Sequence, residues 1–118
     1  MQIRKTKLRT LEMHTKYITF TKDPNFYDNA ESIIEFTAWR IIPNQFPYDA
    51  IATDHHLLIP KRHVTTPAEF TMQEHEDIVM ILTSLTESQE YDQILYNFPH
   101  QQSAPQRFHL HLIKLKTV

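Results

Sequence analysis

The 118-residue chain contains neither cysteine nor glycine. The absence of cysteine excludes disulfides, thiolate catalysis, iron–sulfur clusters and cysteine-ligated zinc. The absence of glycine excludes the phosphate loops of P-loop and dinucleotide-binding domains, because their tight backbone does not tolerate a Cβ. A bound phosphate would therefore depend on side chains or helix ends, and the eight histidines are the obvious candidates.

The chain also lacks a strong charge bias and a long apolar run. Its formal net charge is −2 and 41% of its residues are hydrophobic, as in an ordinary globular domain. No apolar run approaches the eighteen or more residues of a membrane helix, and the start does not resemble a secretory signal. We expect one domain over residues 1–118, in the cytoplasm, with neither nucleic acid nor membrane as partner. Residues 1–16 are an uncertain N-terminal extension, partly helical.

Several short segments combine alternating apolar residues with β-branched and aromatic side chains, which favours strands. The Asp23-Pro24-Asn25 and Pro43-Asn44 clusters would break the chain between them. The predicted strands cover residues 17–21, 34–42, 55–60, 93–98 and 107–114.

One long helix is predicted after these first strands. Thr71 is a candidate N-cap and Glu74 follows three residues later, which is the pattern of a capping box. Apolar residues at helical spacing continue the pattern and predict one buried stripe. The stripe consists of Ile78, Ile81, Leu82 and Leu85. Because residues 99–106 form a loop short enough to join an antiparallel pair, an α+β domain with an antiparallel sheet is expected.

The C-terminal strand presents an unusual row of side chains. Arg107, His109 and His111 alternate with apolar residues, so they share one face, with the two histidines about 7 Å apart. His55 opens another apolar strand. Such a row suits a phosphate group, because imidazole and guanidinium groups can all donate hydrogen bonds to it.

Two other interpretations of this row remain open. The imidazoles could simply be solvated on a sheet surface. Alternatively, His109 and His111 could bind a metal together with His55, since His-x-His is a common ligand pair. No acid or histidine follows His111, and Arg107 would repel a divalent cation, so we expect no metal. With no cysteine and no glycine-flanked serine, an imidazole is the simplest nucleophile.

Three segments resemble the histidine-triad family. Residues 55–64, His-His-Leu-Leu-Ile-Pro-Lys-Arg-His-Val, are similar to its H-x-L-(V/I)-I-P-K-x-H segment. Residues 107–113, Arg-Phe-His-Leu-His-Leu-Ile, resemble its H-φ-H-φ-H-φ-φ signature with the first histidine replaced. Residues 44–47, Asn-Gln-Phe-Pro, resemble the turn before the first segment. The resemblance covers about residues 36–115 and the three motifs occur in the family's order.

The resemblance implies an α+β fold with an antiparallel sheet of about five strands, one long helix and a second shorter one, commonly as a homodimer. It implies a nucleotide with its α-phosphate at the triad and no cofactor. By position, His109 would attack that phosphate and become a nucleotidyl-histidine, and His111 would contact the phosphate or the leaving group. His55 would buttress the triad, and Asn44 would bind the ribose hydroxyls.

Two departures from the family pattern affect this site. Arg107 replaces the first triad histidine, and a guanidinium can neither accept a hydrogen bond nor shuttle a proton, although it can bind a phosphate oxygen. In the altered stretch before it, Ser103 is the expected substitute donor to phosphate. The predicted activity is hydrolysis or transfer of a nucleotidyl group from a phosphoramidate or a dinucleoside polyphosphate. The alternatives are a nucleotide-binding or interaction module with little turnover and, third, a small histidine metalloprotein.

Overall fold

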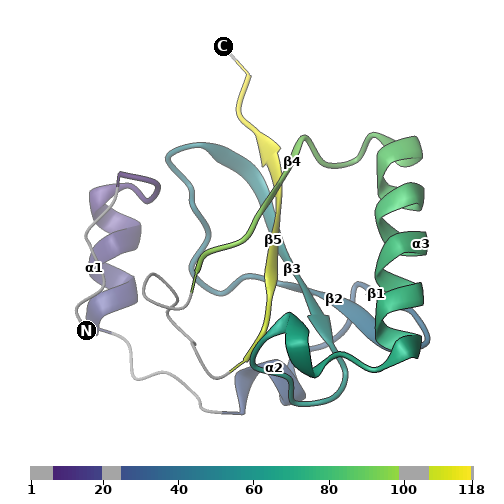
Figure 1. Ribbon diagram of the computed structural model, residues 1–118. Coiled ribbons are helices and arrows are strands. Elements are labelled where there is room, and N and C mark those ends of the chain that lie inside the picture. The colour runs from purple at the N-terminus through teal and green to yellow at the C-terminus, as the bar shows by residue number, and fades with distance from the viewer. Residues whose placement is uncertain (1–6, 20–24, 99–106, 118) are drawn as a thin grey trace.

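In the computed structural model, residues 7–19, 25–98 and 107–117 are described. They form a five-stranded antiparallel sheet in the order β1-β2-β3-β5-β4, with helices around it (Figure 1). The fold class predicted from the sequence is therefore confirmed. The strands are β1 (Ile34–Glu35), β2 (Trp39–Pro43), β3 (Ala52–Pro60), β4 (Gln93–Leu95) and β5 (Leu110–Leu115). The helices are α1 (Leu11–Thr19), α2 (Phe26–Asn29), α3 (Met72–Ser88) and a 3₁₀ turn (Pro67–Glu69).

The centre of the sheet is the pair β3 and β5. In its register His55 lies opposite Ile113, and Leu57 lies opposite His111. Since side chains alternate along a strand and paired residues share a face, His55 and His111 project from the same side of the sheet. His56 projects from the other side, as its position in the alternation predicted.

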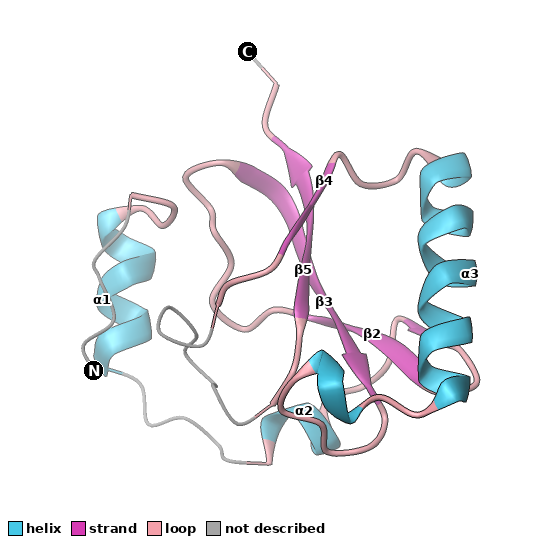
Figure 2. Cartoon of the chain, in the orientation of Figure 1, coloured by secondary structure: helices cyan, strands magenta, loops and turns pink. Residues whose placement is uncertain are grey.

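The opposite face of the sheet is covered by α3, which stands beside the strands in Figure 2. The helix contributes Ile81, with Ile78 and Leu85 packed nearby, to a core cluster formed mainly by the sheet. Two hydrogen bonds attach the helix to β2 and the turn before it. The Trp39 indole Nε1 donates to the Glu74 carbonyl at 3.0 Å, and the Ala38 N–H donates to the Asp77 carboxylate at 2.7 Å. The buried members of the cluster are Trp39, Ile41, Leu58, Val64, Ile81, Phe108 and Leu112.

The predicted start of the long helix is confirmed. The Thr71 hydroxyl accepts from the Glu74 N–H at 3.2 Å, and the Glu74 carboxylate accepts from the Thr71 N–H at 2.7 Å. Arg62 binds the same carboxylate at 2.8 Å. The helix ends where Gln89 adopts a left-handed conformation, with φ of 59°.

The prediction of a strand over residues 17–21 is wrong for residues 17–19, which end α1. Residues 20–21 lie outside the described part. The helix begins beside Thr10, whose N–H and hydroxyl both donate to the Asp49 carboxylate, and Tyr17 packs edge-on against Phe46 at 5.6 Å between ring centroids. These tertiary contacts outweigh the β-propensity of the Tyr-Ile-Thr sequence. The expectation that residues 1–16 are partly helical is confirmed from residue 11 onward.

The single strand predicted over residues 34–42 is in fact a hairpin. The chain reverses between Glu35 and Trp39, where the Phe36 N–H donates to the Trp39 carbonyl at 2.8 Å. No glycine, proline or asparagine marks this turn, so propensity alone did not reveal it. The predicted strand over residues 93–98 is shorter, ending at Leu95, and the predicted strand over 107–114 begins at Leu110. The loop over residues 99–106 lies outside the described part.

Among the helices that the structure describes, none is both long and apolar enough to cross a membrane.

We expect Thr71→Ala to lower the free energy of unfolding by about 1 kcal/mol, because it removes one half of the capping box. Urea denaturation monitored by circular dichroism measures this change. Thr83→Ala is the matched control, since Thr83 is exposed within the same helix and only donates to the Val79 carbonyl. Equal effects of the two substitutions would show that the cap contributes nothing.

Candidate functional site

Three histidines meet on the face of the sheet opposite α3. His55 comes from β3, His111 from β5 and His109 from the residues immediately before β5. Their exposed fractions are 4%, 4% and 3%. The His55 Nε2 lies 2.8 Å from the His111 Nδ1, and the ring centroids of His109 and His111 are 5.0 Å apart. The structure therefore brings together the three residues that the sequence proposed as catalytic.

The proton positions on His55 and His111 follow from a backbone contact. The Tyr48 N–H lies 2.8 Å from the His55 Nδ1, and a backbone N–H can only donate. The His55 Nδ1 is therefore bare and its Nε2 carries the proton. That proton is donated to the His111 Nδ1, so the proton of a neutral His111 is on Nε2.

His109 has the opposite tautomer. Its Nδ1 lies 2.8 Å from the Arg107 carbonyl oxygen, which can only accept, so Nδ1 carries the proton. The Nε2 of the neutral ring is then a bare lone pair. This is the arrangement that makes an imidazole a nucleophile.

Burial keeps this cluster uncharged. Desolvation, together with smaller effects of neighbouring positive charge that include Arg9, lowers the pKa of His55 to about 3 and that of His111 to about 2. The pKa of His109 is lowered by burial, and its hydrogen bond to the Arg107 carbonyl opposes this in part. At neutral pH all three rings are therefore neutral.

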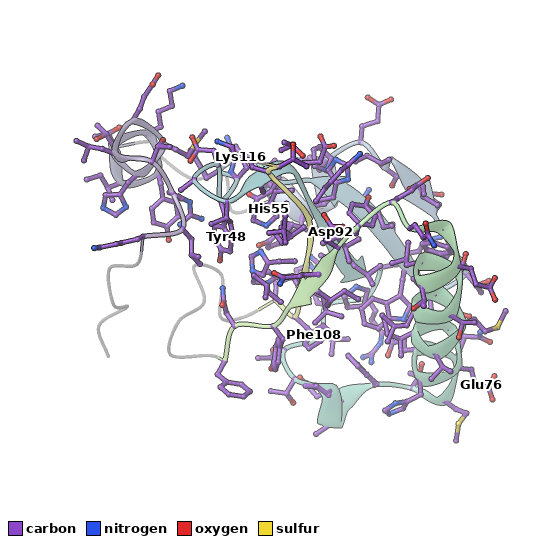
Figure 3. The ribbon with its side chains drawn as sticks, turned by 90° about the horizontal axis from the view of Figure 1, so that it is seen from above. Tyr48, His55, Glu76, Asp92, Phe108 and Lys116 are labelled. Carbon is purple, nitrogen blue, oxygen red and sulfur yellow. The ribbon has the colours of Figure 1, made fainter. Side chains whose placement is uncertain are left out.

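Tyr48 and Asn97 complete the surroundings of His111. The Tyr48 ring stacks on His111 with 5.0 Å between centroids, and Figure 3 shows it beside His55. The Asn97 side-chain amide lies 2.8 Å from the Tyr48 hydroxyl and 3.3 Å from the His111 Nε2. Because that Nε2 donates, the amide fits best with its oxygen turned toward both groups. Asn97 was missed by the sequence analysis, since nothing local distinguishes it from a strand-end asparagine.

Asn44, predicted to bind ribose, lies against His55. Its Oδ1 accepts from the Phe46 N–H at 2.9 Å, and its Nδ2 is 3.1 Å from the His55 Nε2. The residue therefore lies at the edge of the triad. Ser103, the predicted phosphate donor, lies outside the described residues.

Arg107 is almost fully buried, with 5% of its surface exposed. Its Nη1 lies 3.0 Å from the Asp28 Oδ1 and 3.0 Å from the His63 Nε2, and its Nη2 donates to the Pro60 carbonyl at 3.3 Å. Its buried Nε has no hydrogen-bond partner in the described part of the chain. In this structure the guanidinium is bound to protein groups, and the contact to phosphate stays a prediction.

Two elements outside the region of resemblance also reach the site. From α2, the Tyr27 ring faces His109 at 5.7 Å between centroids. From the segment before α1, the Arg9 guanidinium lies 4.2 Å from the Tyr17 ring centroid and 4.9 Å from that of Tyr48, and its Nε donates to the Phe46 carbonyl at 2.9 Å. The sequence analysis missed both, because a four-residue helix has no periodicity and isolated basic residues near a terminus are usually solvated.

The other candidates lie away from the triad. His56 is on the opposite face of β3, with its Nδ1 2.6 Å from the Tyr91 hydroxyl. His63 is at the exit of the strand, beside Asp28. Within residues 7–19, 25–98 and 107–117, no group of three or more His, Asp or Glu side chains is arranged to hold a metal ion.

Comparison with known proteins identifies the fold. No family model matches the sequence, and no curated protein matches it. Among solved structures, a hypothetical protein from Leishmania major is similar at 20% identity and a TM-score of 0.61, over 80% of this chain and 71% of that one. A "Hit Like Protein" is similar at 17% identity and 0.58, over 76% and 93%. A HIT family hydrolase from Legionella pneumophila Philadelphia 1 is similar at 19% identity and 0.54, over 92% and 95%. The chain therefore has the fold of histidine-triad proteins.

We expect the imidazole nitrogens to report two tautomers at pH 7. His55 and His111 should carry their protons on Nε2, and His109 on Nδ1, because of the backbone partners described above. Long-range ¹H–¹⁵N correlation spectra of the histidine rings measure this directly. An Nε2-protonated His109 would contradict its hydrogen bond to the Arg107 carbonyl and remove its free lone pair.

The free energy of unfolding should fall as the pH is lowered from 7 to 5. His55 and His111 bind protons near pH 6.5 when unfolded but only near pH 3 and 2 when folded, so the unfolded state takes up more protons in this window. Each residue should cost about 2 kcal/mol between the two pH values. Urea denaturation at both pH values measures the change. In a His55→Asn variant the free energy of unfolding should fall by about 2 kcal/mol less between pH 7 and pH 5. The same fall as in the wild type would contradict the lowered pKa of His55.

Proposed function

We propose that this chain, which has the histidine-triad fold, binds a nucleoside phosphate conjugate and transfers its nucleotidyl group through His109. The observation that carries the proposal is the bare Nε2 of His109. Its tautomer is fixed by the Arg107 carbonyl at 2.8 Å, and burial keeps the ring neutral at neutral pH. The similarity of the fold to a solved structure named as a hydrolase also supports the proposed activity.

In the proposed first step, the His109 Nε2 lone pair attacks the α-phosphorus. A P–N bond forms while the bond to the leaving group breaks, and the leaving group departs with that electron pair. In the second step water attacks the same phosphorus, the P–N bond breaks, and its electron pair returns to Nε2. One proton is released as the nucleoside monophosphate forms. Another acceptor in place of water would give transfer rather than hydrolysis.

The neighbouring residues have separate proposed roles. The Nε2–H of His111 would donate to a phosphoryl oxygen or to the leaving-group side, where negative charge develops. His55 would hold His111 in the tautomer that keeps this proton on Nε2, through the 2.8 Å bond between them, and the phosphoryl oxygen would replace the Asn97 amide as its acceptor. Asn44 would bind the ribose hydroxyls, and Ser103 would donate to phosphate. A phosphoramidate and a dinucleoside polyphosphate are the proposed substrate classes.

The second candidate function is nucleotide binding with little turnover. The observation that favours it is the burial of His109, of which only 3% is exposed. In-line attack needs access to Nε2, and a covered nucleophile would slow it. Binding of AMP measured by calorimetry, without turnover of either substrate class, would select this alternative.

A homodimer and a cytoplasmic location complete the proposal. The two edges of the described sheet, β1 and β4, each expose an isoleucine, Ile34 at 38% and Ile94 at 42%. Unpaired strand edges with apolar side chains are surfaces through which a second copy of a chain can pair.

Mixing the protein with a fluorogenic adenosine phosphoramidate or a dinucleoside polyphosphate should give a covalent nucleotidyl adduct, detected by mass spectrometry after rapid acid quenching. We expect His109→Ala to abolish the adduct and to lower turnover at least about a thousand-fold, because among the described residues no other imidazole offers such a bare nitrogen at the site.

The matched control for this experiment is His75→Ala, since His75 is exposed on α3, on the far side of the sheet. It should keep both the adduct and the rate. An adduct that survives His109→Ala would remove His109 as the nucleophile.

A further inference from the structure

Arg107 carries a permanent charge into a nearly dry environment. A guanidinium stays protonated in proteins, and burying it is costly unless a carboxylate or several acceptors compensate. The compensating carboxylate is Asp28, whose Oδ1 lies 3.0 Å from Nη1, although 79 residues separate the two in sequence. Asp28 belongs to α2, outside the segment that resembles histidine-triad proteins.

Arg107 is linked to His109 through both its backbone and its side chain. Its backbone carbonyl accepts from the His109 Nδ1, which fixes the tautomer. Its side chain holds α2, which carries Tyr27 onto the ring of His109 at 5.7 Å and a tilt of 32°. The guanidinium carbon itself lies 5.8 Å from the Tyr27 ring centroid. Arg107 therefore connects His109 with Tyr27, the ring that packs beside it.

A second arginine fixes the backbone of the same helix. Arg40 on β2 donates from Nη1 to the Ala30 carbonyl at 2.7 Å, and its Nη2 donates to the Tyr27 carbonyl. These bonds set the position of the helix, but they do not reach its side chains. The Asp28 side chain, by contrast, binds Arg107, so it connects α2 with the segment that carries His109.

We propose that Arg107 and Asp28 are positioning residues that clamp Tyr27 of α2 against His109 and so orient its nucleophilic Nε2. The part of this inference that concerns rate rests on the proposed function. The part that concerns the ring contact does not depend on any activity. This role replaces the direct phosphate contact that the sequence suggested for Arg107.

The geometry argues against phosphate as the partner of Arg107. To bind phosphate, the guanidinium would have to leave Asp28. That carboxylate is 44% exposed at its side chain, so it would stay ionised at neutral pH without Arg107. A bare carboxylate beside an incoming phosphate would repel it. The clamp avoids this repulsion, because each charge neutralises the other.

The Arg107–Asp28 clamp would also limit the access of water to the His109 ring. Its ring faces Tyr27 from α2, Arg107 and His111 from its own segment, and more distantly His55 from β3. Tyr27 is the neighbour that the clamp controls. Releasing it would admit water to the ring, and the pKa of His109 would rise toward its ordinary value of 6.5.

The test is a double-mutant cycle with Asp28→Asn, Arg107→Gln and the double variant, made in the full chain. Single-turnover formation of the His109 adduct measures orientation, and calorimetric titration with AMP measures binding. We expect each single substitution to slow adduct formation about tenfold and the double variant to be no slower than either, because both break the same contact. Arg107→Lys should restore part of the rate, and Glu12→Gln, which removes an exposed carboxylate paired with Lys16, should change nothing.

Asp28→Asn separates the clamp from a phosphate contact. If Arg107 positions Tyr27, this substitution slows adduct formation and leaves AMP affinity within about twofold. If Arg107 binds phosphate, the substitution frees the guanidinium and tightens AMP binding. Tighter binding, an unchanged rate, or independent effects that multiply to about a hundredfold in the double variant would each overturn the proposal.

A second readout uses the free protein and needs no activity. Cross-relaxation between the ring protons of Tyr27 and His109 should be lost in Asp28→Asn, and the pKa of His109 should rise. Asp28 is partly exposed, so this variant should fold, and circular dichroism checks that it does. An absence of turnover in the wild type would defeat the proposed function alone. A retained ring contact with an unchanged His109 pKa in Asp28→Asn would defeat the clamp alone.

Discussion

The site depends on the register between β3 and β5. With His55 opposite Ile113 and Leu57 opposite His111, the two imidazoles meet diagonally on one face and share a 2.8 Å hydrogen bond. A slip of one residue would turn every side chain of one strand to the opposite face and separate the rings. The apolar residues between the histidines bind the other face of the sheet to α3, so the core and the site are fixed by the same alternation.

Burial keeps the three imidazole rings of the cluster neutral, and the charged groups lie beside the rings. The three histidines are neutral because water is excluded from them, and backbone groups choose their tautomers. Two cations in the described part of the chain lie near the site, and each is bound by protein groups. Arg9 lies between aromatic rings and binds a carbonyl, and Arg107 is paired with Asp28. The site is therefore built from neutral imidazoles, and the two cations beside it are bound by other groups of the protein.

Where the sequence succeeded, a local interaction or a strict period carried the signal. The capping box of Thr71 and Glu74 involves residues three apart, and it forms as predicted. The period of two placed His109 and His111 together, and it separated His55 from His56. Where prediction failed, a distant contact decided. The strand expected at Tyr17 became the end of a helix because Asp49 and Phe46 bind that segment. The hairpin at residues 36–38 was missed because no turn residue marks it.

The sequence by itself determined the long helix and which side chains share a face within a strand, because these follow from alternation and spacing within short segments. That His55 joins His109 and His111 was implied by the resemblance to histidine-triad proteins, not by alternation. The tertiary structure alone decided the proton positions and the partner of Arg107. A tautomer depends on which backbone group faces each nitrogen, here the Tyr48 N–H and the Arg107 carbonyl. An ion pair across 79 residues leaves no pattern in the chain. Contacts between elements far apart in sequence form only when the chain packs, so the order of residues alone does not reveal them.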